Sequence, residues 1–522
     1  MRSSLKAGRL TPCPPIDSTG LRVAQGIARM LQAGAIADPR FSASETTLGK
    51  WWRRHSYILP SFFASLIVWC WFVTWGDWKF FEQEEFCGFY DAYARAILHG
   101  HVDVPRSAIG LEAFTFEGKT YGYFGIAPAL LRIPLVLIFP NMDGQWSRVM
   151  MLAAATTSLV CAYALLRMFH GPARELTTGG RVLHSIFILS AGIGSTIVFL
   201  IGRSYTFHEA LAWSGAFSLL FAWAIARYFQ RPQTKFLFLA AALSFMSFHS
   251  RPTTGAGALL AMAIVAVVLA VRAFRKPGFA AAIFGFGKVE RPGREAAIAL
   301  TAVAVTAAIY FGVGYAKFKT FEPMPMRYYD FYRQFPIRMR ITEGKQLHLR
   351  NVPSAIATYF GVHGFMIKPA FPWLYPEEEQ TVIGWPRNDV LEPFSTVPVS
   401  MPALSLLAII GIAALSSAPN EALKRARLSA ATLFAGGSLV LATVGITERY
   451  LHDFYPVLII CAAAGVARVS CSPRLGRINA LVAVLASVSI ALNCSFSFIH
   501  QRKNFDTPEQ LQPSVNSILR GD

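Results

Sequence analysis

A chain of 522 residues with 54% apolar residues, 15% charged residues and a mean hydropathy of +0.41 is too apolar for a soluble protein of several domains. Apolar segments of about 20 residues recur, the length that crosses roughly 30 Å of hydrocarbon as a helix. The net charge of +19 is better explained by basic cytoplasmic loops than by nucleic-acid binding, so we expect no nucleic-acid partner. We therefore expect an all-α polytopic membrane protein.

Residues 1–50 are polar and basic, contain four prolines and lack the long apolar core of a signal peptide. We interpret them as a cytoplasmic tail, because Lys50, Arg53 and Arg54 hold the start of the first span inside. The expected parts that follow are an N-terminal membrane core over 51–316 with an acidic first outward loop at 77–122, an outward basic and aromatic loop over 317–399, membrane helices over 400–498 and an outward tail over 499–522.

The expected number of membrane helices is 11 to 13. The candidate spans are 57–75, 123–140, 148–168, 182–202, 206–228, 235–249, 253–271, 295–316, 400–417, 428–446, 451–468 and 477–498. Short loops rich in Lys and Arg mark the cytoplasmic side, and the loops at 272–294, 418–427 and 468–477 are of this kind. This places the N-terminus inside and both the first loop and 317–399 outside.

An even number of crossings must separate two outward loops, but seven candidates lie between these two. We prefer the interpretation that 123–140 does not cross fully, because Pro128, Pro134 and Pro140 interrupt it and Arg132 lies in its middle. The alternatives are a further crossing, or one loop that breaks the positive-inside trend.

The first outward loop carries a quarter of the acidic residues of the chain. We expect a short helix after its first acids, lying along the membrane surface and ending at Gly100. Next comes a segment of the form (D/E)GKxYxxxGxxPALLxxP, at residues 117–134. Together these features resemble the GT-C superfamily of polytopic glycosyltransferases, in particular the protein mannosyltransferase and aminoarabinose transferase group, which use polyprenyl-phosphate sugars. The resemblance covers 82–135 and is weaker at 203–212 and 447–456.

The resemblance implies a general base in this loop, because an acceptor hydroxyl must lose its proton as the sugar carbon is attacked. Glu85 matches best by its distance to Gly100, and Glu84 and Asp91 are the alternatives. The acids that we interpret as solvated are Glu82, Asp103 and Glu112.

Two further segments place polar residues beside predicted spans. His208 contacts phosphate or acceptor in one interpretation, and is a histidine satisfied at headgroup level in the other. Arg449 is similar to the arginine of the family's RYxxxxxP segment and contacts the phosphate of the leaving group, or else pairs with Asp453 one helical turn on. The expected substrate-binding residues are Arg449, Tyr450, His452, His208, Arg203, Lys119 and Tyr121.

Basic and aromatic residues alternate in 317–399, which suits either a groove for lipid phosphate and sugar rings or a membrane-surface anchor. The chain has no glycine-rich phosphate loop, HExxH or CxxC spacing, so we expect no ATP, NAD or zinc site. No metal ligands are identified, and the need for a divalent cation stays open.

We therefore expect a bacterial-type glycosyltransferase of the inner membrane. It moves a sugar from a polyprenyl-phosphate donor to a glycan, lipid or protein acceptor on the outer face. One alternative is a cell-envelope polysaccharide polymerase or ligase, which needs a basic outward loop but no acidic first loop. A secondary transporter is the less favoured alternative, because it places charges at mid-bilayer in paired broken helices.

Overall fold

The computed structural model describes residues 55–84, 86–171, 176–274, 284–377, 390–417, 420–470 and 472–502. The chain divides into two compact units, residues 1–59 and residues 60–522, and the contacts described below lie within the second. The described residues are mainly helical, with three two-stranded sheets. The expected all-α polytopic membrane fold is confirmed.

Eight helical segments are long and apolar enough to cross a membrane, counted over the described residues. They are formed by α3 (Leu59–Val73), α6 (Ser147–His170), α7 (Thr178–Gly192) with α8 (Thr196–Ile201), α9 (Thr206–Gln230), α11 (Pro252–Phe274), α13 (Pro292–Phe318), η7 (Glu448–Phe454) with α20 (Tyr455–Val469), and α21 (Leu475–Arg502).

The number of full spans is lower than the expected 11 to 13, although every predicted span coincides with a helix. The helices α18 (Pro402–Ser417) and α19 (Glu421–Gly437) form a bent pair, which is either one broken span or a re-entrant element. Two others, α5 (Ala127–Ile138) and α10 (Thr234–Phe248), are short apolar helices. A helix rises about 1.5 Å per residue, so the 12 residues of α5 do not cross the hydrocarbon. The interpretation that 123–140 does not cross fully agrees with this length.

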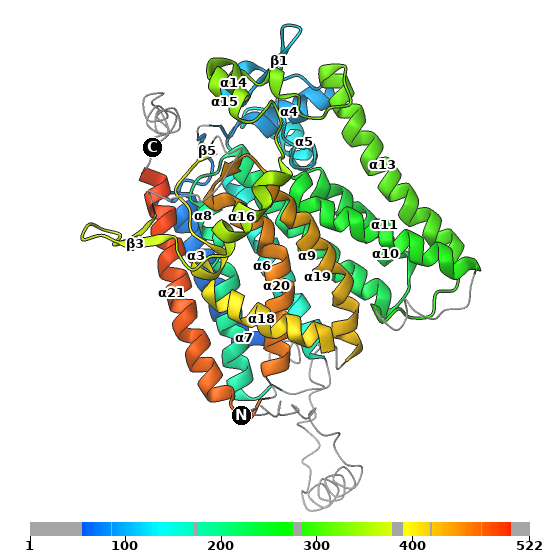
Figure 1. Cartoon of the computed structure of the whole chain (residues 1–522), viewed down its shortest axis with the longest axis vertical. Coiled ribbons are helices and arrows are strands. Elements are labelled where there is room, and N and C mark those ends of the chain that lie inside the picture. Colours follow the sequence, from blue (N-terminus) through cyan, green and yellow to red (C-terminus); the bar gives the residue numbers. More distant parts are fainter. Residues whose placement is uncertain are drawn as a thin grey trace, which may run out of the picture. The chain divides into compact units, whose positions relative to one another are not determined.

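Helix α20 lies beside α18, α6 and α19 (Figure 1). Glycines bring α18 and α20 into backbone contact: a Cβ at Gly411 would lie 1.7 Å from the carbonyl oxygen of Cys461. On the facing helix, a Cβ at Gly465 would lie 2.0 Å from the carbonyl oxygen of Leu407. Close approach through small residues is the usual way in which helices associate in lipid.

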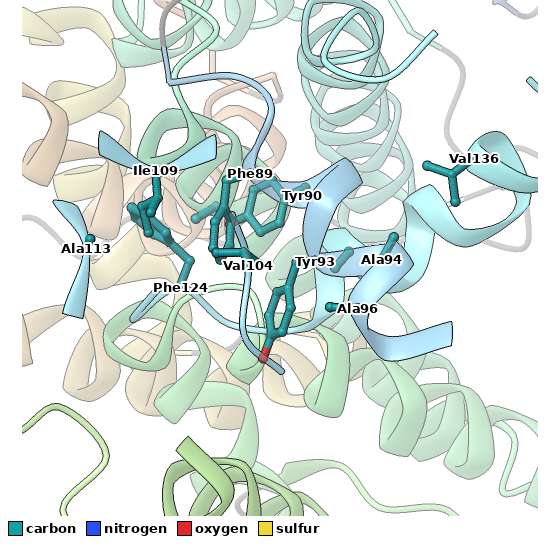
Figure 2. Packing of buried hydrophobic residues seen from close by; sticks show 12 residues of the cluster. Phe89, Tyr90, Tyr93, Ala94, Ala96, Val104, Ile109, Ala113, Phe124 and Val136 are labelled. Carbon is teal, nitrogen blue, oxygen red and sulfur yellow. The ribbon is translucent and has the colours of Figure 1, made fainter. Parts of the chain in front are cut away.

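The first loop is a folded part of the molecule. Its helix α4 (Phe89–Leu98) ends where the sequence predicted, because Gly100 adopts a φ of +78°. Figure 2 shows Phe89, Tyr90 and Tyr93 of this helix gathered with Phe124, which precedes α5. The apolar face of α4 is therefore buried inside the protein.

Three pairs of short strands join loop segments. The first pair, β1 (Phe114–Phe116) and β2 (Lys119–Tyr121), is an antiparallel hairpin whose turn holds Glu117 and Gly118 at positive φ. The others are antiparallel β3 (Phe365–Ile367) with β4 (Leu374–Pro376), and parallel β5 (Val390–Leu391) with β6 (Gly445–Ile446).

Short helices fill the rest of the loops. They are η1 (Ser56–Ile58), η2 (Arg106–Ala108), η3 (Gly110–Glu112), η4 (Met326–Tyr328), α14 (Asp330–Gln334), α15 (Pro336–Ile341), η5 (Leu349–Asn351), α16 (Val352–Phe360), α17 (Val397–Ser400) and η6 (Ser438–Ala442).

The long loop that follows α13 packs on the first loop. Tyr329 stacks on Phe114 with ring centroids 4.8 Å apart, and the backbone N–H of Asp330 donates to the carbonyl of Ala113 at 2.9 Å. The rings of Phe318 and Tyr121 extend this contact. Segments about 200 residues apart in sequence are thereby brought together.

Candidate functional site

Arg449 forms the centre of the site, in the first turn of η7. Its Nη1 donates to both carboxylate oxygens of Glu392, at 3.0 and 2.8 Å, and its guanidinium lies 4.6 Å from the centroid of the Phe207 ring. The Arg449 side chain is 17% exposed and that of Glu392 is 24% exposed. An ion pair at this depth still has access to solvent, so another anion can reach the guanidinium.

The parallel pairing of β5 with β6 brings Glu392 to Arg449. The backbone N–H of Glu392 donates to the carbonyl of Ile446 at 3.0 Å. One residue before Arg449, the buried carboxylate of Glu448 accepts from the backbone N–H of Ser395 at 2.6 Å and from the hydroxyl of Ser400 at 2.9 Å. These bonds fix the end of the long loop against the start of η7.

Asp453 pairs with Arg251 and not with Arg449. Its carboxylate accepts from Arg251, with Nε at 3.1 Å and Nη2 at 3.0 Å, and from the hydroxyls of Thr253 and Thr254. These residues form the start of α11, where the helix dipole favours a negative charge. The alternative in which Arg449 pairs with Asp453 is therefore wrong.

The ring of Tyr450 lies between the two cations. The guanidinium carbon of Arg251 is 5.0 Å from its centroid, and that of Arg449 is 5.6 Å from it. Cations are attracted to aromatic faces, so the ring holds both guanidiniums in one small region. Of the expected substrate-binding residues, Arg449 and Tyr450 are brought together here.

The end of the first loop reaches the same region through a glycine. A Cβ at Gly125 would lie 1.9 Å from the carbonyl oxygen of His249, which also accepts from the N–H of Ala127 at 3.0 Å. This approach places the loop beside Arg251, and the charges of Arg251 and Arg449 both act on the hydroxyl of Tyr123. Only glycine allows the two backbones to lie so close.

Glu112 is the described first-loop acid whose ionisation Arg449 influences. The hydroxyl of Tyr329 donates to its carboxylate at 2.8 Å. Burial raises the pKa of Glu112 above its usual value, and the bond from Tyr329 and the charge of Arg449 offset part of this effect. The interpretation of Glu112 as a solvated loop acid is only partly right, because the residue is half-buried and bonded to the long loop.

The three predicted catalytic acids have different positions. Glu85 lies outside the described residues. Glu84 accepts from Nε of Arg148 at 2.7 Å and from the backbone N–H of Ser204 at 3.0 Å, and burial raises its pKa. Asp91 is fully buried and accepts from the backbone N–H of Gly144 at 2.6 Å. Glu84 and Asp91 therefore already hold protein partners.

Asp91 belongs to a buried cluster that joins four helices. Nη1 of Arg132 lies 3.3 Å from Asp91, and Nη2 donates to Glu209 at 2.7 Å and to the hydroxyl of Ser147 at 3.0 Å. The side chains of Arg132, Asp91 and Glu209 are 0% exposed. Burial raises the pKa of Asp91, and Arg132 offsets part of the increase. The cluster ties α4 and α5 to α6 and α9.

Of the other expected substrate-binding residues, His208 lies near enough to Arg449 for the guanidinium charge to act on its imidazole, and the rest lie elsewhere or are engaged in packing. Arg203 donates to the carbonyls of His500 and Gln501, at 3.1 and 2.8 Å, which ties the end of α21 to the turn between α8 and α9. The remaining four are His208, bonded to the carbonyl of Arg203; His452, bonded to the hydroxyl of Thr196 and stacked on Tyr455; Lys119, exposed beside Asp103; and Tyr121, packed on Phe318.

The arrangement has the chemistry for a phosphate and a proton. Two guanidiniums with aromatic neighbours suit the oxygens of a phosphate group, and a carboxylate of raised pKa suits proton transfer. Sequence reasoning missed Arg251, Glu392 and Glu112. Only Arg251 could have been predicted from the sequence. It is a cation directly before Pro252 at the start of an apolar span, and such a cation needs a polar partner. Among the described residues, no three His, Cys, Asp or Glu gather as a metal site.

Comparison of the sequence with family models and with curated proteins finds no match. The structure is similar to the oligosaccharyltransferase of Archaeoglobus fulgidus in the apo form, with a TM-score of 0.50 and 12% identity over 89% of this chain. That similarity covers 58% of the other chain, so this protein spans less than two thirds of its length.

Two further structures from that organism give lower scores. One is AglB in complex with an inhibitory peptide and a dolichol-phosphate, with a TM-score of 0.48, 13% identity, and 90% and 59% of the two chains covered. The other is tethered to an acceptor peptide, with a TM-score of 0.43, 12% identity, and 86% and 56% covered. These two carry no further weight, and the first similarity shows that the chain shares the fold of that oligosaccharyltransferase.

Proposed function

We propose that this protein is a membrane glycosyltransferase of the GT-C type, which moves a sugar from a polyprenyl-phosphate donor to an acceptor. The observation that carries the proposal is the pair of partly exposed guanidiniums of Arg449 and Arg251 on the Tyr450 ring, with the first-loop carboxylate of Glu112 within the range of the Arg449 charge. The fold, shared with an oligosaccharyltransferase, supports the same reaction class.

Arg449 binds the phosphate of the leaving group. The carboxylate of Glu392 now receives both bonds from its Nη1, and an arriving phosphate replaces that carboxylate. As the bond between the anomeric carbon and the phosphate oxygen breaks, negative charge grows on that oxygen. Arg449 then stabilises the transition state more than the bound donor, which is the condition for faster turnover.

A first-loop carboxylate removes the proton of the acceptor hydroxyl. The oxygen bonds to the anomeric carbon, the proton goes to the carboxylate, and the electrons of the broken bond leave with the lipid phosphate. Glu85 is the base that the family resemblance implies, and Glu112 is the described first-loop acid on which the charge of Arg449 acts. The acceptor is a glycan, a lipid or a protein that carries such a hydroxyl.

The reaction takes place on the outer face of the inner membrane, and the N-terminal tail lies in the cytoplasm. The basic loops support this orientation, because short loops rich in Lys and Arg stay inside. The first loop and the loop over 317–399, which contribute Glu112 and Glu392 to the site, then face outward.

The test compares cell-envelope glycans from cells with and without the gene by mass spectrometry, and then measures the same product in variants. Arg449→Met should lower the rate of product formation about a hundredfold or more, as for the loss of one strong oxyanion donor. Arg449→Lys keeps the charge without the two-point geometry and should retain a fraction of the rate.

Glu392→Gln is the matched control, because it removes the carboxylate partner and leaves the guanidinium. Under the proposal it keeps activity, since the phosphate no longer competes with a carboxylate. If Glu392→Gln and Arg449→Met lose activity and thermal stability equally, the ion pair is structural and the phosphate role is refuted. An unchanged glycan profile without the gene would refute the transferase itself.

A further inference from the structure

An apolar groove lies between α3, α21 and the β3–β4 hairpin. Its volume is about 380 Å³, and half of its ten lining residues are aromatic: Trp71, Phe72, Phe371, Trp373 and Phe498. The hairpin and α21 lie side by side in Figure 1. Trp373 is 56% exposed and Phe371 is 49% exposed, so the hairpin side of the groove is accessible from outside.

The groove lies at the membrane–water boundary. It is lined by the last residues of α3, which ends at Val73, and by the last turns of α21, which ends at Arg502. Both helices are candidate spans, and both therefore end on the side of the first loop. Tryptophans gather at the ends of membrane helices at the level of the lipid headgroups, and Trp75 and Trp78 follow α3 here.

A cation marks the polar end of the groove. The guanidinium of Arg502 lies 4.3 Å from the centroid of Phe498 and 6.0 Å from that of Phe371, both of which line the groove. The residue is exposed. A groove with apolar walls and a positive end matches a molecule with an apolar chain and an anionic head.

We propose that this groove binds one chain of an anionic phospholipid from the leaflet on the first-loop side, with the lipid phosphate on Arg502. In a bilayer the acyl chain of the lipid is already surrounded by hydrocarbon. The walls of the groove therefore contribute shape complementarity to binding rather than a hydrophobic driving force. The charge of Arg502 then sets the headgroup preference, expected at about fivefold for one arginine near an anionic surface. The inference does not depend on the proposed glycosyltransferase activity.

Native mass spectrometry of the full-length protein tests the site. The protein is delipidated in a non-ionic detergent and given equal amounts of phosphatidylglycerol and phosphatidylcholine with the same chains. One retained lipid per protein molecule is expected, with phosphatidylglycerol preferred over phosphatidylcholine about fivefold. Arg502→Gln should reduce this preference to about equal while a lipid is still retained.

Two variants test the groove itself. Cys494→Trp places a large ring among the lining residues and should abolish retention of both lipids. Trp373→Ala removes a wall from an exposed hairpin position, so it leaves the helices intact and should also abolish retention. The controls on α21 are Arg477→Gln and Val484→Trp, exposed positions that are not among the groove residues and should behave as wild type.

Three results would overturn the proposal. They are retention unchanged in Trp373→Ala, a headgroup preference unchanged in Arg502→Gln, and displacement of phosphatidylglycerol by an equimolar polyprenyl phosphate. Thermal unfolding of each variant, measured beside lipid retention, separates loss of the groove from loss of the fold.

Discussion

Replacing Arg132 by methionine should destabilise the protein more than a typical surface change. Arg132 contacts the carboxylates of Asp91 and Glu209, at 3.3 and 2.7 Å, and all three side chains are 0% exposed. The methionine fills similar volume but leaves two carboxylates in a region closed to water. Removing one partner of a buried ion pair costs about 3–5 kcal/mol, because the remaining charge is uncompensated.

The penalty should depend on pH in a defined direction. Burial already raises the pKa of Asp91, and the variant loses the cation that offsets part of this increase. A carboxyl group whose pKa is higher in the folded state than in the unfolded state favours folding more as the pH falls. Arg132→Met should therefore be closer to wild type at pH 5 than at pH 8.

The compensated variant Arg132→Met with Asp91→Asn and Glu209→Gln carries no buried charge at this site. Replacing a whole buried ion cluster is often neutral, so this triple variant should recover most of the lost stability. Thermal unfolding in detergent at both pH values is the assay. If Arg132→Met unfolds at the wild-type temperature at pH 8, the cluster does not hold the first loop and the reasoning fails.

Three further predictions concern the site and its orientation. If Glu112 is the base, Glu112→Gln abolishes transfer. The hydroxyl of Tyr329 lowers the pKa of Glu112, so Tyr329→Phe should raise that pKa and move the acid limb of the pH–rate profile to higher pH. An acid limb that does not move would show that another residue is the base. A cysteine replacing Lys345 should react with a membrane-impermeant reagent added outside and one replacing Lys288 should not, and the opposite labelling would reverse the topology. Gly125→Ala should separate the loop from the end of α10 and reduce activity and stability together, since its Cβ would lie 1.9 Å from the carbonyl oxygen of His249. Wild-type stability would contradict that contact.

Local patterns in the sequence were enough to predict most of the helices. The spans were predictable because an apolar segment of sufficient length is a local feature of the sequence. The end of α4 was predictable because a glycine can adopt the positive φ that ends a helix, as Gly100 does. The number of membrane crossings was less predictable, because hydropathy does not give the length of a helix. Helices α5 and α10 are apolar but short.

The site was only partly predictable, because its ion pairs join distant segments. Arg449 was identified from its local motif, but its partner Glu392 comes from another loop through the β5–β6 pairing. Glu112 looked like any exposed acid, since the ring that covers it, Tyr329, is 217 residues away. The density of acidic residues indicated the first loop. The acid that lies near Arg449 could not be identified in the same way, because its position depends on tertiary packing.

The glycine contact between α18 and α20 has a consequence for motion. Where two backbones touch at Gly411 and Gly465, no layer of side chains lies between them that could change rotamer, so the helices resist sliding. Helix α20 continues directly from η7, which carries Arg449 and Asp453. The start of η7, with these two residues, is therefore held in place relative to α18.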